Sequence, residues 1–410
     1  QLLEVIKSEY LSDDIYVKIK NFCDINLGKT VIETKDTPGF IGNRIGIFWI
    51  ERATVEAINH NLTVEEADLI IMKIFNVPKT GVFGLIDVVG LDLIPAVVNS
   101  LLKNIPKEDY YIQVHQNPEI FKFMIENKMI GRKGDGGFYK LKIVNNKKIK
   151  YSLNLNTCEY FKSQKPNIPN IKLINKNIKY FLEDDNNVSK FSLKVLLDVL
   201  YYILSITEEI ATDIVSIDET MKNGFGWKNG PFEIIDNLGT SFLKEKFKEL
   251  YNSTPRLLEI IGDNKFYKIE SKNIMFFDFK YKKYKILKRP KGVLLLSDFK
   301  KLSLPLKKIN TASLWDIGEK VALFEINSKS NTIDMATLNF LDQCIDIVSS
   351  SYHSLIIYNE GDYFSAGANL GEALFLGNIG LESEVNKNIL SKGQEVYTRL
   401  KYSKFPVIAA

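Results

Sequence analysis

The chain has 410 residues, of which 45% are apolar and 25% are charged, and its net charge is +4. This composition excludes collagen-like, low-complexity and disordered chains, and the length predicts several domains. The small net charge does not by itself indicate a nucleic-acid-binding protein. Three widely spaced cysteines (Cys23, Cys158 and Cys344) offer neither a disulfide framework nor metal-ligand spacing, and no apolar run is long enough to span a bilayer. We therefore expect a reducing compartment and no metal site.

Residues 1–35 predict the end of an α/β domain. An apolar strand over 2–6 precedes an amphipathic helix with Ile15, Val17, Ile19 and Phe22, and a second strand covers 30–33. The sequence begins at Gln1 inside this pattern and stops at Ala410 in a strand-like segment, so we expect an internal piece of a longer polypeptide. No G-x-G-x-x-G phosphate loop occurs, and any nucleotide-binding fold is expected to begin upstream.

Residues 36–140 predict a helical domain. Pro38 suits a helix start, and a long helix is expected to run to about Asn59. Asn43 lies in its first turn, where an amide can donate to or accept from a carbonyl or hydroxyl group. Thr63 and Glu66 form a capping box that opens the next helix, which ends near Pro78.

An internal repeat follows. Gly81, Phe83, Ile86, Asp87 and Gly90 recur 149 residues later as Gly230, Phe232, Ile235, Asp236 and Gly239. Residues 216–219 read as a second capping box. These matches predict two copies of one helical module, over 36–140 and 186–262, with a polar linker over 141–185. The second copy lacks the Pro-Gly-x-x-x-Asn-Arg segment, so we expect it to be structural.

The remaining sequence divides into a basic stretch and a new domain. Residues 263–312 read as a linker, and Lys280–Lys308 could attract coenzyme A phosphates, anionic lipid or RNA, although a solvated linker is expected. Residues 313–410 show strand, helix and strand, followed by a loop of small residues at 361–371. This order predicts one β-α-β unit at the start of an α/β domain.

The segment from Lys35 to Arg44 closely resembles the signature of L-3-hydroxyacyl-CoA dehydrogenases, and three other segments agree with it. Residues 3–6 resemble the strand that carries the Glu of their His–Glu dyad, residues 81–90 their G-P-F-x-L-x-D-x-x-G element, and residues 131–139 their domain end. The resemblance implies that Glu4 orients a catalytic His, expected upstream of Gln1, that Asn43 and Ser12 bind substrate, and that Lys133 reaches NAD. Ser12 stands where the family has Thr-Ser, Val82 replaces a common Pro, and Gly134 replaces a usual Thr. The three histidines of the chain match no catalytic position of that family.

The last segment resembles a second family. Residues 331–334 and the loop at 359–370 are similar to the start of the crotonase (enoyl-CoA hydratase/isomerase) fold. The resemblance implies that the backbone amide of Ala368, after Gly367, forms part of an oxyanion hole, and that Ala366 presents its carbonyl to the adenine of coenzyme A. The acid/base Glu residues of that family are expected past Ala410.

Together, these resemblances imply a multidomain chain: the end of a Rossmann-like domain (1–35), two all-α modules, and the start of a crotonase-like domain (313–410). The implied function is NAD-dependent oxidation of L-3-hydroxyacyl-CoA, fused to enoyl-CoA hydratase in fatty-acid β-oxidation, with this piece alone inactive. Two alternatives are a short-chain 3-hydroxybutyryl-CoA dehydrogenase of storage or butyrate metabolism and a non-catalytic scaffold. We expect acyl-CoA substrates, no nucleic acid, a homodimer or hetero-oligomer, a thiolase as a candidate partner, and a bacterial-like cytoplasmic location, with mitochondria or peroxisomes as alternatives.

Overall fold

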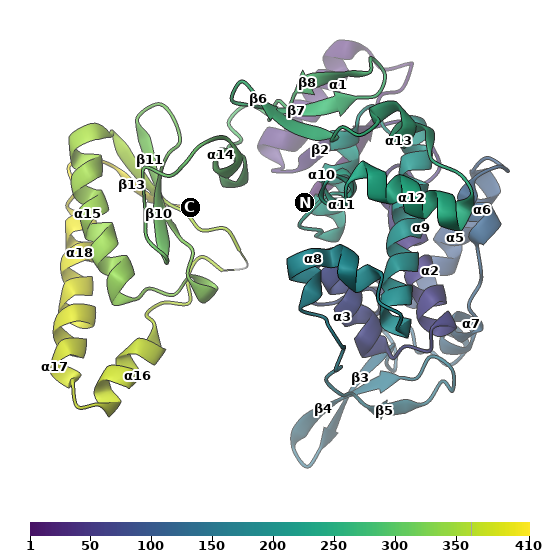
Figure 1. Cartoon of the computed structure of the whole chain (residues 1–410), viewed down its shortest axis with the longest axis horizontal. Coiled ribbons are helices and arrows are strands. Elements are labelled where there is room, and N and C mark those ends of the chain that lie inside the picture. The colour runs from purple at the N-terminus through teal and green to yellow at the C-terminus, as the bar shows by residue number, and fades with distance from the viewer. Residues whose placement is uncertain (362) are drawn as a thin grey trace. The chain divides into compact units, whose positions relative to one another are not determined.

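The computed structural model describes residues 1–361 and 363–410, and the chain divides into two compact units. The first unit comprises residues 1–268 and 275–286, and the second comprises residues 269–274 and 287–410. Figure 1 labels most of the helices and strands of both units. The chain passes from one unit to the other within residues 269–287, which is earlier than the expected start of the last domain at residue 313.

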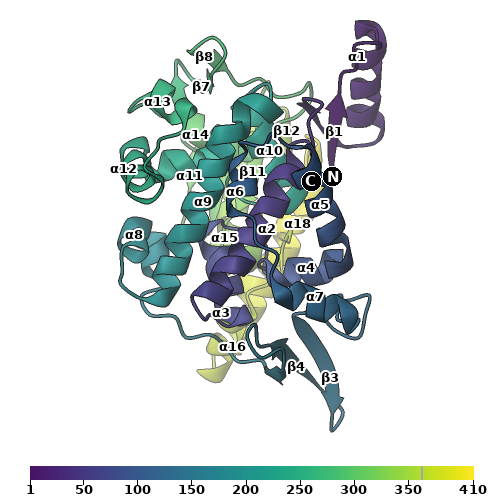
Figure 2. The same ribbon diagram turned by 90° about the vertical axis from the view of Figure 1, so that its right-hand side faces the viewer.

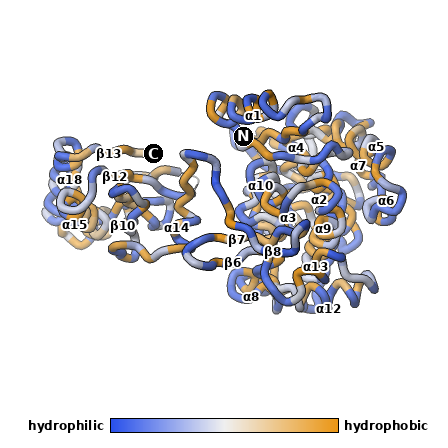
Figure 3. Tube along the Cα trace, turned by 90° about the horizontal axis from the view of Figure 1, so that it is seen from above, coloured by the Kyte–Doolittle hydropathy of each residue, from blue (hydrophilic) through white to orange (hydrophobic). Residues whose placement is uncertain are grey.

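The first unit opens with a parallel two-stranded sheet. Strand β1 (Leu2–Ile6) pairs with β2 (Thr30–Thr34), and Glu4 stands opposite Ile32. The crossover between them is α1 (Asp13–Asn21), continued by the π-helical turn η1 (Phe22–Asn26), as parallel strands require a long connection. Apolar and polar residues alternate along α1 (Figure 3), and its apolar Ile15, Val17 and Ile19 are exposed whereas Tyr16 is buried. The predicted strand–helix–strand order is confirmed.

Two long helices form the centre of the first unit (Figure 2): α2 (Gly42–Asn59) and α9 (Asn187–Ile210). In α2, 15 of the 18 residues are buried, which identifies it as a core helix and not a surface helix. Phe48 of α2 stacks on Tyr202 of α9 with ring centroids 4.0 Å apart. The buried guanidinium of Arg52 on α2 bonds Asp198 of α9 at 3.0 Å, so the two helices share an ion pair within an apolar core.

Gly46 allows α2 to pack closely against α10 (Ile214–Phe225). A Cβ atom at Gly46 would stand 2.0 Å from Cζ of Phe225, so the ring occupies the space of the missing side chain. We expect Gly46→Ala to lower the free energy of unfolding by about 1–3 kcal/mol, because overpacking costs more than the gain in helix propensity. Chemical denaturation tests this.

The matched control for this substitution is Gly84→Ala in α4 (Phe83–Val89), where the new Cβ would meet Thr80 at an ordinary 3.4 Å. That variant should be neutral or slightly stabilising. Equal stability of the Gly46→Ala protein and the unmodified protein would contradict the packing described for Phe225.

The internal repeat is present as two sets of helices, each followed by a three-stranded antiparallel sheet. The first set contains α3 (Val64–Ile74), α4, η2 (Leu91–Leu93), α5 (Ile94–Asn104), α6 (Tyr110–Val114), α7 (Glu119–Glu126), β3 (Tyr139–Val144), β4 (Lys147–Leu153) and β5 (Tyr160–Lys162). The second contains α10, α11 (Pro231–Leu238), α12 (Thr240–Tyr251), α13 (Arg256–Ile261), β6 (Tyr267–Glu270), β7 (Asn273–Asp278) and β8 (Lys283–Ile286). Helix α8 (Leu173–Leu182) and then α9 connect the two sets.

A closed hydrogen-bond circuit holds the first copy together. The carboxylate of Asp68 on α3 accepts the amides of Val82 and Phe83 at 2.8 Å each, and thereby caps α4. Asp87 on α4 accepts the amides of Phe138 and Tyr139 at the start of β3, also at 2.8 Å. The Tyr139 hydroxyl then donates back to Asp68 at 2.8 Å, so helix, helix and sheet are joined in a ring.

The second copy repeats this arrangement. Asp218 of α10 accepts the amide of Phe232 at 2.8 Å, and Asp236 of α11 accepts the amides of Phe266 and Tyr267 at 2.7 Å each. The pKa of Tyr267 is raised well above its ordinary value by burial and by the neighbouring Asp218 carboxylate. Because Asp236 bonds the start of its sheet as Asp87 does in the first copy, the repeat extends beyond the helices into the sheets.

This finding corrects both expected linkers. Residues 141–185 contain most of β3, with β4, β5 and α8, and residues 263–312 contain β6, β7 and β8, helix α14 (Leu296–Leu302) and strand β9 (Lys307–Lys308). The second copy therefore runs to Ile286 and not to residue 262. These strands are Lys-rich because much of each small sheet faces solvent, which hides the alternation typical of a half-buried strand.

One predicted cap is confirmed and the other is wrong. Thr63 and Glu66 form the capping box that opens α3. In the second copy the cap is Asp213, whose carboxylate accepts the amide of Ser216 at 2.8 Å, and Ser216 lies inside α10. With Asp213 as the cap, the separation in sequence from Asp213 to Gly230 nearly equals the separation from Thr63 to Gly81 in the first copy.

The second unit is built on a five-stranded sheet of order β13-β12-β11-β10-β9. Strand β10 (Ala312–Asp316) is antiparallel to β11 (Val321–Ile326), whereas β12 (Ser354–Ile357) and β13 (Val407–Ala409) run parallel to β11. Helix α15 (Met335–Ser351) is the crossover from β11 to β12, and Phe340 on it packs against Phe324 with ring centroids 5.8 Å apart. The predicted strand–helix–strand unit is confirmed.

The short helix η3 (Lys329–Asn331) lies between β11 and α15. The remaining helical segments of the second unit come after β12: α16 (Leu370–Asn378), α17 (Glu382–Glu384), η4 (Val385–Ser391) and α18 (Lys392–Lys401). Over the described residues, no single helix is both long and apolar enough to cross a membrane; the bent pair Phe83–Val89 and Leu91–Asn104, with an angle of 84°, meets that test only jointly.

Candidate active site

Glu4 lies at the N-terminus of α2. Its Oε1 accepts the backbone amides of Ile41 at 2.8 Å and Gly42 at 3.0 Å, two of the amides that a helix start leaves without an internal partner. A Cβ atom at Gly42 would be 3.2 Å from Glu4 Oε2, so glycine leaves room for the carboxylate. Burial raises the pKa of Glu4, and the two amide hydrogen bonds act against that rise.

Asn43 follows directly after Gly42 in the first turn of α2. Its side chain is exposed and makes no hydrogen bond with the part of the chain that the structure describes. An exposed amide beside a carboxylate can donate to or accept from a bound carbonyl or hydroxyl. Glu4 and Asn43 are thus brought to one end of one helix, from segments far apart in sequence.

A tight turn delivers the chain to this helix end. Gly39 has a φ of +77°, which favours glycine, and its carbonyl accepts the amide of Arg44 at 3.1 Å. The helix itself begins at Gly42, so Pro38 belongs to the turn before the helix and not to its first residue. The buried Arg44 side chain stabilises the turn by donating hydrogen bonds to the Pro38 carbonyl at 3.4 Å and to the Tyr202 hydroxyl at 2.5 Å.

The second copy also reaches this site, which the sequence did not suggest. Thr220 on α10 places its Cγ2 3.5 Å from the position of a Cβ at Gly42, and its buried hydroxyl has no hydrogen-bond partner among the described residues. Gly224 of the same helix faces Leu2 on β1, the strand of Glu4. The expectation of a structural second copy is therefore incomplete: α10 also lies against Gly42 and Leu2 beside Glu4. The repeat predicted the helix, but no local signal identified which of its residues face Gly42.

Ser12 and Lys133 are placed elsewhere. Ser12 is the exposed residue before α1 and makes no side-chain capping bond. Lys133 is exposed, and its Nζ donates to the Val89 carbonyl at 3.0 Å beside Gly90. No contact within residues 1–361 and 363–410 joins either residue to Glu4 or Asn43.

The fit of the chain to NAD is partial. Lys133 supplies one exposed cation that could hold a phosphate or hydroxyl oxygen, whereas the sequence contains no glycine-rich phosphate loop. Among the described residues, no group of three or more His, Cys, Asp or Glu side chains could hold a metal ion.

Two histidines pair with carboxyl-bearing residues of α2 away from Glu4. His115 Nδ1 is 2.9 Å from the buried carboxylate of Glu51, and His60 Nδ1 is 2.9 Å from the Glu56 carbonyl. Neither contacts Glu4 or Asn43 in the described part of the chain.

In the small-residue loop of the second unit, the amides of Ala366 and Gly367 are bonded within the loop region and the next amide is not. The Ala366 amide donates to the Ser330 carbonyl at 3.1 Å, and the Gly367 amide donates to Ser365 Oγ at 3.0 Å. By contrast, the Ala368 amide has no acceptor among the described residues. Gly367 has a φ of +85°, the conformation that lets the loop turn here. A free amide in such a loop can stabilise a developing oxyanion.

The chain is similar to one family model and to several known proteins, over different shares of its length. Residues 39–141 match the family model described as 3-hydroxyacyl-CoA dehydrogenase, C-terminal domain. The chain is 31% identical over 410 residues to the "Putative fatty acid oxidation complex trifunctional enzyme" of Rickettsia prowazekii, and 30% identical over 420 residues to a "Probable 3-hydroxyacyl-CoA dehydrogenase" of Bacillus subtilis. These alignments cover 100% of this chain but 53% and 52% of the relatives, so the chain spans about half the length of the curated relatives it matches. The crystal structure of a 3-hydroxybutyryl-CoA dehydrogenase from Escherichia coli aligns at 15% identity and a TM-score of 0.44, over 63% of this chain and 66% of that one.

Proposed function

We propose, from the match of residues 39–141 to the 3-hydroxyacyl-CoA dehydrogenase C-terminal domain model, that the complete polypeptide oxidises L-3-hydroxyacyl-CoA to 3-ketoacyl-CoA in fatty-acid oxidation. The observation that carries this proposal is the placement of Glu4 and Asn43 at one helix end. Bound NAD would supply the hydride acceptor for this reaction, and Lys133 would help to hold it. The 31% identity along the whole chain to a protein named as a fatty acid oxidation enzyme supports it.

Glu4 and Asn43 each suit a role in this chemistry. Oxidation of a secondary alcohol needs a base for the hydroxyl proton while the hydride leaves from carbon, and an imidazole serves this role near neutral pH. Glu4 would orient that imidazole and stabilise its charged form, and the imidazole is expected before Glu4 in the complete polypeptide. Asn43 would hold the substrate oxygen, since its amide is exposed beside Glu4.

The proposal includes enoyl-CoA hydratase activity for the second unit. The free amide of Ala368 supports it, because hydration of an enoyl thioester develops negative charge on the thioester oxygen. The product of hydration is the 3-hydroxyacyl-CoA that the dehydrogenase consumes, so the two activities are consecutive. We extend the proposal to a thiolase-type partner and a cytoplasmic location.

The direct test is Asn43→Ala in the complete polypeptide, assayed for NADH formation from an L-3-hydroxyacyl-CoA. We expect kcat/KM to fall by about 10–100-fold, the effect of losing one or two hydrogen bonds to the reacting group. The matched control is Asn59→Ala, which removes an exposed amide from the other end of α2 and should leave the rate unchanged. Unchanged oxidation by the Asn43→Ala enzyme would remove Asn43 from the site.

A further inference from the structure

The second copy contains a basic cleft for which the proposed reaction has no use. It has a volume of about 590 Å³ and lies between the C-terminal end of α9, the start of α13 and the turn that joins β7 to β8. Five cationic side chains line it: Lys35, Arg256, Lys280, Lys282 and Lys285. The volume is within the range of about 300–1,000 Å³ that small-molecule sites occupy.

Three carboxylates also line the cleft, and each is already engaged. Glu208 pairs with Arg256 at 2.8 Å, and Asp278 forms a short ion pair with Lys285. Asp213 caps α10 through the amide of Ser216. Asp213 keeps its negative charge, so the five cations outnumber the three carboxylates and the lining of the cleft is net positive.

The three remaining ammonium groups have no carboxylate partner among the described residues. Lys35 Nζ donates to the Glu208 backbone carbonyl at 2.5 Å, a contact that orients the ammonium group without neutralising it. Lys280 and Lys282 lie in the turn between β7 and β8, and Lys280 stands 5.5 Å from the centroid of the Tyr281 ring. A concave surface with unpaired cations concentrates an anionic ligand.

Aromatic side chains give the cleft a second property. Phe276, Phe279 and Tyr281 line it together with the cations. The two phenylalanines pack on the main core, whereas Tyr281 is 56% exposed and has the Nζ atoms of Lys280, Lys283 and Lys285 at 5.5, 5.4 and 4.4 Å from its ring centroid. A planar heteroaromatic ring stacks on such a surface, and cations around it hold phosphate groups.

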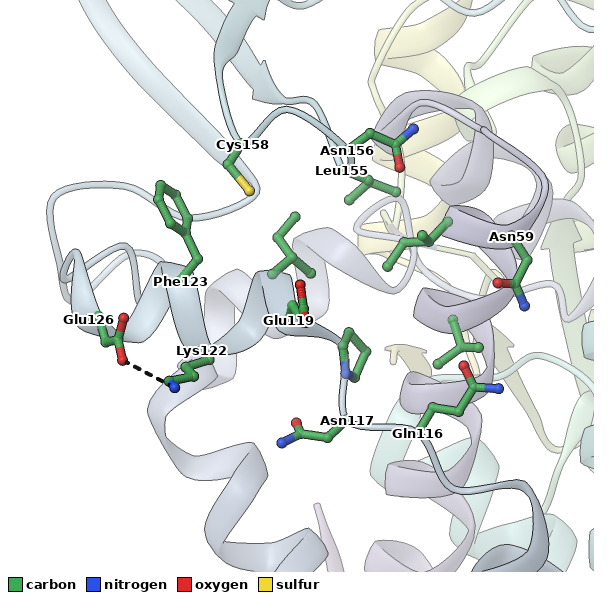
Figure 4. Close-up of a pocket in the computed structure, with 14 residues that line it drawn as sticks. Asn59, Gln116, Asn117, Glu119, Lys122, Phe123, Glu126, Leu155, Asn156 and Cys158 are labelled. Atoms are coloured by element: carbon green, nitrogen blue, oxygen red, sulfur yellow. Dashed lines mark ion pairs between the residues drawn. The ribbon is translucent and has the colours of Figure 1, made fainter.

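The first copy shows that the fold does not require this chemistry. Its equivalent cleft, of about 750 Å³, lies at the C-terminal end of α2, beside α7 and the loop between β4 and β5 (Figure 4). Helices α7 and α13 both begin directly after a proline, Pro118 and Pro255, which supports the equivalence. The cleft of the first copy is lined mainly by apolar residues and four side-chain amides, and its one cation, Lys122, pairs with Glu126 at 4.0 Å.

We propose that the basic cleft of the second copy binds a nucleoside diphosphate, either free or as the nucleotide part of a larger molecule. Lys35, Lys280 and Lys282 would hold the phosphates, and Tyr281 would stack on the base. A concave site with three convergent ammonium groups favours a small ligand over an extended polyanion, which would need a longer basic track. The second copy then has a binding role of its own in addition to its packing role.

The test is calorimetric titration of the complete polypeptide with ADP, with NADH in excess to occupy the proposed dinucleotide site. We expect one ADP per chain, and a Kd raised about tenfold or more by K280Q/K282Q, since charge-assisted hydrogen bonds to phosphate are lost. The matched control, K147Q/K148Q, removes the same charge from the exposed sheet of the first copy and should leave the Kd unchanged. Absence of ADP binding, or equal weakening by both double variants, would overturn the proposal.

Other ligands and one aromatic variant separate the remaining possibilities. Coenzyme A binding more tightly than ADP, with the same sensitivity to K280Q/K282Q, would identify the larger molecule as the source of the nucleotide. Tyr281→Ala should weaken ADP binding and leave the binding of inorganic phosphate unchanged; equal binding of both anions to the unmodified cleft would overturn the nucleotide assignment. Tighter binding of a single-stranded oligonucleotide would replace the proposal with a nucleic-acid site.

Because Lys280 and Lys282 are outside the oxidation site, K280Q/K282Q should retain 3-hydroxyacyl-CoA oxidation, so the two proposals can fail independently.

Discussion

Replacing Glu4 by Gln in the complete polypeptide should slow the turnover of L-3-hydroxyacyl-CoA by about 10²–10⁴-fold, the range for impaired acid–base catalysis. The amide oxygen of Gln can still accept the amides of Ile41 and Gly42, so the start of α2 keeps its cap. What is lost is the negative charge that stabilises a protonated imidazole. We therefore expect a fall in kcat with little change in folding.

Two further measurements make this result specific. Glu4→Ala removes the charge and the cap together, so it should lower both kcat and the midpoint of thermal unfolding. Enoyl-CoA hydratase activity, measured on the same Glu4→Gln preparation, should be normal, because Ala368 and its loop belong to the other unit. Equal loss of both activities in a folded protein would contradict two separate sites.

The fold could be predicted wherever residues close together in the sequence determine the structure. The long α2 helix follows from its apolar residues, and Thr63 opens α3 because a Thr and a Glu three residues later satisfy each other's amides. The same reasoning failed at Ser216, because Asp213 stands three residues earlier and its carboxylate accepts both the amide and the hydroxyl of Ser216. Two overlapping capping patterns cannot be ranked without the packing of the helix.

The sheets of the two copies were missed for a different reason. Their positions depend on Asp87 and Asp236, whose partners at the sheet starts are 51 and 30 residues away. Such pairings leave no trace in the periodicity of the sequence. The basic stretch beginning at Lys280 was similarly read as a linker, and the structure divides it between the two units, with its first part lining the cleft.

The candidate site was predictable only in part. The resemblance supplied Glu4 and Asn43, and the structure adds that the amide of Gly42, next to Asn43, is bonded to Glu4. Thr220 could not be found in this way, because its position against Gly42 depends on how the second copy packs on the first. The sequence therefore predicts residues of one copy better than contacts between copies.

Asp68→Ala should lower the free energy of unfolding by about 3–5 kcal/mol. Its carboxylate accepts the amides of Val82, Phe83 and Gly84 and the hydroxyl of Tyr139, all at 2.8–3.2 Å. An unsatisfied buried donor costs about 1–3 kcal/mol, and water entering the space left by the side chain recovers part of that cost. Burial raises the pKa of Asp68 to about 7 against these hydrogen bonds, so removing its desolvation penalty offsets another part.

Chemical denaturation of four variants tests this estimate. Asp68→Asn keeps one acceptor oxygen and should lose less stability than Asp68→Ala, while Asp135→Ala, which removes an exposed carboxylate from a turn of the same copy, should be nearly neutral. Asp218→Ala should behave like Asp68→Ala but with a smaller loss, because Asp218 accepts one backbone amide where Asp68 accepts three. Equal stability of Asp68→Ala and Asp135→Ala would mean that the ring of hydrogen bonds through α3, α4 and β3 does not hold the first copy together. The long-range contacts that the sequence could not reveal would then be dispensable, and packing of the apolar helix faces alone would have to account for the fold.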